Sequence, residues 1–203
     1  MKIVVVDYGM GNIKSIVSVL KYLEVDEISV SNNPFEIASA DKLILPGVGS
    51  FAMAMSNIKK LNLDKYLKDA VIVNKKPILG ICLGMQLMGG SSTEDLHSFG
   101  LGFIQGSVNR FSAPSLKIPH IGFNQVKVNN NLKLFRGIDN VSDFYFVHSY
   151  KMMSEYDINQ SICHYGNDFV SSYEVGNIAG VQFHPELSQT NGLKLLDNFI
   201  KYL

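Results

Sequence analysis

The sequence lacks an excess of charge of either sign. Its 203 residues include 18 Lys or Arg and 18 Asp or Glu, so the formal net charge at pH 7 is zero. Proteins that bind nucleic acid through its phosphates usually carry a basic excess. The balance therefore disfavours a nucleic-acid-binding protein, and a hydrophobic fraction of 46% excludes general disorder.

Cysteine is scarce, and long apolar runs are missing. The two cysteines, Cys82 and Cys163, are too few for a disulfide framework. The longest nearly uncharged apolar stretch, residues 78–88, is too short to span a bilayer and contains glycines. The chain opens directly into a strand-like segment without secretory-signal features. We therefore expect a cytoplasmic protein without membrane spans, and the length suits a single domain over residues 1–203.

The first half of the chain alternates predicted strands and helices. Short apolar runs typical of buried strands lie at residues 2–7, 28–31, 43–45 and 78–82. Apolar residues at helical spacing predict helices over residues 13–23 and 53–67, with a further helix ending at residue 74. This alternation predicts an α/β fold with a largely parallel central sheet and helices on both faces.

The second half changes character. Strand-like segments lie at residues 101–111, 122–128, 144–151, 161–164, 170–174 and 179–184, and turns containing Gly or Asn separate several of them. A final helix is predicted to bury Leu193, Leu196, Ile200 and Leu203 on one face. The simplest interpretation is one α/β domain with an added antiparallel β section.

Residues 77–86 (PILGICLGMQ) carry the most informative motif. Cys82 lies between Gly80 and Gly84, where a buried strand meets an apolar helix, which is the cysteine counterpart of a nucleophile elbow. The glycines allow close backbone approach, the helix dipole favours a thiolate, and the N–H of Leu83 would point toward a developing oxyanion. An isolated cysteine is more often structural, but this setting favours a nucleophile.

A cysteine nucleophile needs a base, and the base needs an orienting group. His184 ends an apolar run and is followed by Pro185 and Glu186. The carboxyl ends of parallel strands line the active crevice, and Glu186 is close enough in sequence to fix the imidazole tautomer. Taken separately, His184 is a strand-end histidine and Glu186 a solvated or capping carboxylate. Together with an elbow cysteine they favour a catalytic triad.

The other histidines and the second cysteine are interpreted as non-catalytic. His97 is expected in solvent, His120 in a structural role, and His148 in either a structural or a substrate-contacting role. Cys163 is expected in the core, with His164 on the opposite face of the same strand. No metal site is expected, because the histidine spacings match no metal-binding pattern and Cys-x-x-Cys is missing.

Two glycine-containing loops follow predicted strands. Gly9 and Gly11 begin a dinucleotide-binding pattern, but Lys14 occupies its third glycine position, so the pattern fails. The loop at residues 46–49 (PGVG) is either an ordinary strand-ending turn or a source of backbone N–H groups for an oxyanion.

Residues 80–86 and 183–186 resemble the class I, triad-type glutamine amidotransferases. The resemblance narrows to the glutaminase subunits of imidazole glycerol phosphate synthases through residues 6–12 (VDYGMGN), 46–49, 119–124 (PHIGFN) and 146–150 (FVHSY). It implies a three-layer domain that hydrolyses L-glutamine without a cofactor. It also implies a heterodimer in which ammonia passes to a (βα)₈-barrel synthase subunit, which forms imidazole glycerol phosphate and aminoimidazole carboxamide ribotide in histidine biosynthesis.

The resemblance also implies roles for individual residues. Cys82 would attack the glutamine carboxamide to form a thioester, His184 would shuttle protons, and Glu186 would orient His184. The remaining implied contacts are the oxyanion donors Gly47, Val48 and Leu83 and the substrate-binding residues Gln86, Ser149 and Tyr150.

Two departures leave the pathway open. The segment after the elbow, residues 89–94 (GGSSTE), lacks the bulky and acidic residues common there in the family. Phe123 stands where the family usually has Trp, so the aromatic body is kept and the indole donor is lost. Since both departures lie where partner specificity could differ, an alternative is the same chemistry serving a sugar amidotransferase in surface-polysaccharide synthesis. Gln86 and residues 148–150 disfavour a free-standing cysteine hydrolase, and the intact triad disfavours a binding module without activity.

Overall fold

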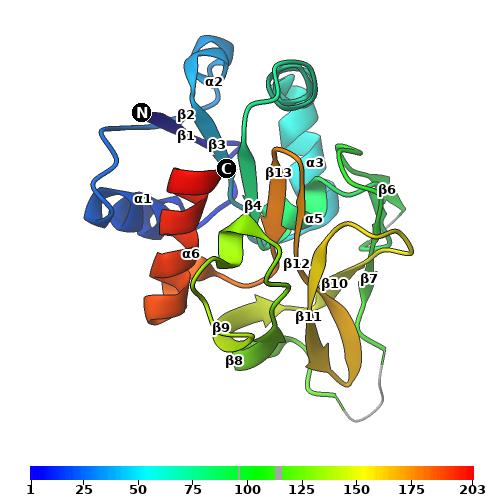
Figure 1. Ribbon diagram of the computed structural model, residues 1–203. Helices are drawn as coiled ribbons and strands as arrows, with labels where there is room; N and C mark the ends of the chain where they lie inside the picture. The colour runs from blue at the N-terminus through cyan, green and yellow to red at the C-terminus, as the bar shows by residue number, and fades with distance from the viewer. Residues whose placement is uncertain (96, 113–115) are drawn as a thin grey trace.

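The computed structural model describes residues 1–203 except residues 96 and 113–115. One continuous sheet crosses the molecule with the main strand order β2-β1-β3-β4-β13-β12-β10-β7-β5-β6 (Figure 1). Its parallel part consists of β1 (Lys2–Val6), β2 (Glu27–Ser31), β3 (Lys42–Leu45), β4 (Ile78–Ile81) and β13 (Ile178–Val181). Strands β3, β4 and β13 are buried along their whole length, as continuous apolar runs predict.

Helices cover both faces of the parallel part, which confirms the predicted architecture. Ile3 and Val5 of β1 face α1 (Ile13–Tyr22) and α6 (Gln189–Tyr202), whereas Val4 and Val6 face the other layer. That other layer contains α2 (Pro34–Ser39), α3 (Phe51–Lys60), α4 (Leu63–Lys68), the π-helix η1 (Asp69–Val73) and α5 (Leu83–Leu87). Within the described residues, no helix is long and apolar enough to cross a membrane.

The antiparallel section occupies the other end of the sheet (Figure 1). It contains β7 (Ser107–Arg110), β8 (His120–Lys127), β9 (Val141–His148), β10 (Tyr150–Met153), β11 (Gln160–Tyr165) and β12 (Asn167–Val175), with the short strands β5 (Ser91–Ser92) and β6 (Ser98–Phe99) at the edge. Strands β8 and β9 pair with each other over their full length, and β11 links β8 to β12. Short 3-10 helices lie at η2 (Lys133–Phe135) and η3 (Pro185–Leu187).

The prediction of a strand over residues 101–111 is wrong in its first half. Only Ser107–Arg110 form a strand. The N–H groups of Leu101 and Phe103 instead donate to the carbonyls of Leu87 and Met88, over 2.7 and 2.9 Å. Residues 101–104 therefore satisfy the carbonyl groups that the end of α5 leaves free, and they are not available to a sheet ladder.

Three further predictions need correction. The predicted helix 53–67 is divided, because Asn62 adopts a left-handed conformation (φ 53°) between α3 and α4. The predicted strand 144–151 is interrupted at Ser149, between β9 and β10. The buried stripe of α6 is rotated from the predicted one, because Asn198 turns inward and donates to the carbonyls of Leu134 and Arg136, each over 2.8 Å. The buried residues of α6 are Gly192, Leu195, Leu196, Asn198 and Phe199.

Candidate active site

Cys82 lies at a sharp bend between β4 and α5. Its backbone has φ 52° and ψ −110°, a conformation that residues other than glycine rarely adopt. The neighbouring glycines permit the bend, since a Cβ on Gly80 would overlap the backbone of Met85 and a Cβ on Gly84 would overlap the carbonyl of Leu45. This is the strand–turn–helix geometry of a nucleophile elbow, in which strain presents the nucleophile.

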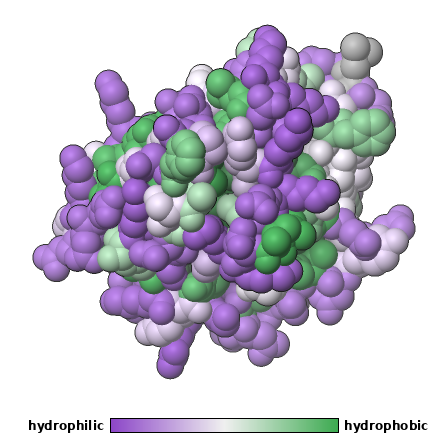
Figure 2. Space-filling model, turned by 90° about the horizontal axis from the view of Figure 1, so that it is seen from above, coloured by the Kyte–Doolittle hydropathy of each residue, from purple (hydrophilic) through white to green (hydrophobic). Residues whose placement is uncertain are grey.

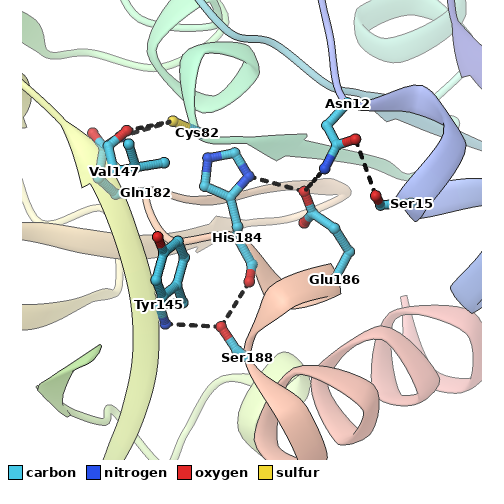
Figure 3. Close-up of polar contacts among 9 residues, drawn as sticks. All are labelled: Asn12, Ser15, Cys82, Tyr145, Val147, Gln182, His184, Glu186 and Ser188. Atoms are coloured by element: carbon cyan, nitrogen blue, oxygen red, sulfur yellow. Dashed lines mark hydrogen bonds and ion pairs between the residues drawn. The ribbon is translucent and has the colours of Figure 1, made fainter. Parts of the chain in front are cut away.

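The parallel pairing of β4 with β13 brings distant residues to the elbow. Ile81 lies opposite Val181, and the N–H of Cys82 donates to the Val181 carbonyl over 2.8 Å. Gln182, the residue directly after β13, is fully buried, and its Nε2 atom lies 3.7 Å from Cys82 Sγ. His184 follows two positions later, and its ring lies between Cys82 and Glu186 (Figure 3).

His184 and Glu186 form a buried pair. Nδ1 of His184 lies 2.9 Å from Oε1 of Glu186, and the two side chains are 3% and 0% exposed. Asn12 Nδ2 also donates to this oxygen over 3.4 Å, while Asn12 Oδ1 accepts from Ser15 over 3.0 Å (Figure 3). Nε2 of His184 is buried and has no hydrogen-bond partner among the described residues. This nitrogen is thus left to exchange a proton with the thiol or with substrate.

The electrostatics of the site favour a charged imidazole. Burial by itself would lower the pKa of His184, but the neighbouring Cys82 sulfur and the Glu186 carboxylate raise it to about 10. Both neighbours are negative when ionised, so each stabilises the imidazolium. The arrangement can therefore hold a thiolate–imidazolium pair, the reactive state of a cysteine nucleophile.

A pocket of about 510 Å³ opens beside the sulfur. The residues assigned from the sequence that line it are Val48, Cys82, Leu83, Gln86, Ser149 and Tyr150. Gly47 is instead buried behind the pocket, where a Cβ would overlap the hydroxyl of Tyr8. The carbonyl before it, that of Pro46, accepts from Tyr8 over 2.7 Å. The oxyanion role of Gly47 stays a prediction, and the structure adds Gly49 to the lining.

Three polar residues around the site, Glu94, Gln182 and Asn12, were not predicted from the sequence. Glu94 lines the pocket, accepts from the N–H of Phe51 over 2.8 Å, and has a pKa raised by burial. Gln182 contacts Cys82, and Asn12 contacts Glu186. A polar Gln within the apolar run 178–183 was a usable signal, whereas Glu94 lies in a loop with no distinguishing pattern.

Of the residues interpreted as non-catalytic, His148 lines the pocket together with Cys82, whereas the others lie in the core or are exposed. Cys163 is buried, and His164 is exposed on the opposite face of β11, as predicted. Nδ1 of His164 lies 2.7 Å from Oδ1 of Asp168. His97 is exposed. In the part of the chain that the structure describes, no group of three or more His, Cys, Asp or Glu side chains is arranged to hold a metal ion.

An elbow cysteine beside a buried His–Glu pair, on this sheet, defines a class I glutamine amidotransferase. The model of the family "Glutamine amidotransferase class-I" matches residues 4–202, and the chain belongs to this family. Solved structures share the fold. The structure of PurLQS from Thermotoga maritima matches with TM-score 0.71 and 17% sequence identity, and the match covers 99% of this chain and 98% of the PurLQS chain. The glutaminase domain of Trypanosoma brucei CTPS has TM-score 0.69 and 14% identity, covering 99% of this chain and 94% of that one.

More similar relatives carry one shared name, imidazole glycerol phosphate synthase subunit HisH. The Campylobacter jejuni (strain RM1221) protein is 46% identical over 98% of this chain and 99% of its own length. The Methanosarcina acetivorans protein is 43% identical, with 98% of each chain covered. The Aquifex aeolicus protein is 43% identical over 98% of this chain and 96% of its own.

Proposed function

We propose that this chain is the glutaminase subunit of an imidazole glycerol phosphate synthase and hydrolyses L-glutamine to glutamate and ammonia. The full-length similarity to HisH subunits from bacteria and archaea supports the pathway, histidine biosynthesis. The observation that carries the chemistry is the position of Cys82, strained at the elbow next to the buried pair of His184 and Glu186.

The proposed reaction proceeds in two halves. Cys82 Sγ attacks the carboxamide carbon of glutamine, and His184 donates a proton to the departing nitrogen, which leaves as ammonia. The resulting thioester is then attacked by water, which loses a proton to His184, and the C–S bond breaks to release glutamate. Glu186 orients His184 throughout by accepting from its Nδ1.

Backbone N–H groups would stabilise the oxyanion that forms in each half. Leu83 occupies the first helical position after Cys82, and both Leu83 and Val48 line the pocket. Gly47, the third expected donor, precedes Val48 and lies against Leu83 and Gly84. Gln86, Ser149 and Tyr150 would bind the amino-acid end of the substrate.

The ammonia is proposed to pass directly to a (βα)₈-barrel synthase subunit. Ile121 and Phe123 of β8 and Val147 of β9 are exposed apolar side chains on the outward face of the β8–β9 pair. Val147 also lines the active-site pocket, so the pocket lies next to this apolar face. Exposed apolar clusters of this kind mark protein interfaces, and we place the partner there.

The test uses the complex assembled with a histidine-pathway synthase subunit. Cys82→Ala should abolish glutamine-dependent product formation and leave ammonia-dependent formation intact, because only ammonia supply requires the sulfur. His164→Ala, an exposed histidine, is the control. If ammonia fails to rescue the Cys82→Ala complex, or if the chain binds a sugar amidotransferase and not the histidine-pathway subunit, the assignment is wrong.

A further inference from the structure

Two buried histidines lie outside the proposed triad. His120 of β8 and His148 of β9 are opposite each other in the antiparallel register and are 3% and 7% exposed. Nδ1 of His120 lies 3.0 Å from Nε2 of His148. Phe146 and Tyr165 stack on the His120 ring at centroid distances of 4.8 and 4.0 Å, so aromatic side chains enclose the ring.

The partners of these rings determine the direction of every hydrogen bond. Nδ1 of His148 lies 2.8 Å from the carbonyl oxygen of Tyr150, which only accepts, so this nitrogen must carry the hydrogen. In the neutral ring Nε2 of His148 then accepts, and Nδ1 of His120 donates to it. Nε2 of His120 is in turn an acceptor.

Asn124 supplies the donor for that acceptor. Its Nδ2 lies 3.2 Å from Nε2 of His120 and also donates to the carbonyl of His164 over 3.1 Å. Its Oδ1 accepts from the N–H of Gln125 over 2.8 Å, so two backbone partners fix the orientation of the amide.

Both rings must be neutral for the hydrogen bonds from Asn124 through His120 and His148 to the Tyr150 carbonyl all to point the same way. Burial lowers the pKa of His120 to about 4 and that of His148 to about 3. The hydrogen bond to the Tyr150 carbonyl opposes this effect at His148, and the charges of His184 and Lys151 add to it. Neutral rings at physiological pH are consistent with the hydrogen-bond directions deduced from geometry.

This series of hydrogen bonds ends at Tyr150 and Gln86, which line the substrate pocket. The Tyr150 carbonyl that accepts from His148 also accepts from Nε2 of Gln86 over 2.9 Å, and the same Nε2 donates to Oε1 of Gln182 over 2.8 Å. Both amide hydrogens of Gln86 are thus engaged. Gln86 can meet substrate only through Oε1, an acceptor suited to the ammonium group of an amino acid.

We propose that His120 and His148 are positioning residues for substrate glutamine. The series of hydrogen bonds from Asn124 through the two histidines holds the Tyr150 carbonyl in place. That carbonyl in turn fixes the amide of Gln86 with its oxygen toward the pocket. This inference rests on the proposed glutaminase function and adds to it the residues that set the affinity for glutamine. It predicts an effect on substrate binding, with little effect on the chemistry at Cys82.

The experiment measures steady-state glutamine hydrolysis by the assembled complex. His148→Phe removes the donor to Tyr150 and should raise KM for glutamine by about 3- to 10-fold, the value of one hydrogen bond, with kcat changed less than about twofold. His148→Asn can place an amide hydrogen near the former Nδ1 and should return KM to within about twofold of wild type. Ammonia-dependent synthesis should be unchanged in both variants.

Phe146→Leu is the matched control, because Phe146 packs on the same His120 ring without joining the hydrogen-bond chain. It should lower thermal stability and leave KM unchanged. Equal KM shifts in His148→Phe and Phe146→Leu, or a fall in kcat at unchanged KM, would overturn the inference. If His148→Phe does not fold, His120→Phe, which keeps the aromatic stacking, should still raise KM by about twofold or more, and an unchanged KM would again overturn it. A wild-type complex that does not hydrolyse glutamine would instead refute the proposed function.

Discussion

At the scale of single residues, the site depends on atoms that have no alternative partner. Nε2 of His184 is buried and unpaired among the described residues, although Nδ1 of the same ring is fixed by Glu186. Leaving a buried polar atom unpaired costs free energy. A position that tolerates this cost is typical of a catalytic group whose partner is the reacting atom.

His184→Ala should therefore lower kcat for glutamine hydrolysis by about 10³-fold or more, because the thiol loses its base and the leaving nitrogen loses its acid. The fold should persist, which circular dichroism and unchanged ammonia-dependent synthesis would verify. His97→Ala, at an exposed histidine, serves as the control. Near-normal turnover in His184→Ala would assign the base to another group.

The sequence allowed Cys82, His184 and Glu186 to be selected because each follows an apolar run that ends at a turn. Their mutual distances depend on β4 pairing in parallel with β13, a contact between segments about a hundred positions apart. The three-residue set was therefore a hypothesis until the register was known. Glu94 and Asn12 could not be selected in this way, because loops without periodicity position them.

At the scale of elements, continuous apolar strands were predictable and irregular segments were not. Residues 101–104 contain Leu, Phe and Ile like a strand, but their N–H groups bond to the end of α5. The inward turn of Asn198 on α6 likewise depends on carbonyl groups near η2, more than sixty residues earlier in the chain. Such choices follow from tertiary hydrogen bonds, which local periodicity does not contain.

The β8–β9 pair should make the stability of the chain depend on pH. His120 and His148 have lowered pKa values in the folded state, about 4 and about 3, compared with about 6.5 when unfolded. Below about pH 6.5 the unfolded state binds more protons, so the free energy of unfolding should fall as pH decreases toward about 4. The slope is at most about 1.4 kcal/mol per pH unit for each histidine.

Urea unfolding between about pH 4.5 and 7.5 would measure this slope. His120→Phe should flatten it, whereas His97→Phe should not. Below about pH 6.5 His184 does not interfere, because its raised pKa makes its stabilising contribution complete there. Above that pH the contribution is lost as pH rises toward 10, in wild type and variants alike, so the comparison between them is unaffected. Parallel pH curves for wild type and His120→Phe would contradict the neutral, buried state of His120.

At the scale of the whole molecule, the two ends of the sheet differ in what they present to a partner. The end carrying α2 is mostly hydrophilic, with small separate hydrophobic patches (Figure 2). The β8–β9 pair lies at the other end (Figure 1) and exposes Ile121, Phe123 and Val147 beside the active-site pocket. Because Phe123 also packs against Tyr145 at a centroid distance of 5.5 Å, the apolar face extends across both strands.

Phe123→Glu should therefore weaken binding of the proposed synthase subunit by about tenfold or more, since it places a charge in the centre of the proposed apolar interface. The same variant should keep its thermal stability, because the side chain is 49% exposed in the isolated chain. Phe35→Glu on α2 is the matched control, as Phe35 is 82% exposed at the opposite end of the molecule. Isothermal titration with the synthase subunit measures both variants. Equal affinities for Phe123→Glu, Phe35→Glu and wild type would show that the partner docks elsewhere, and that ammonia leaves the pocket by another route.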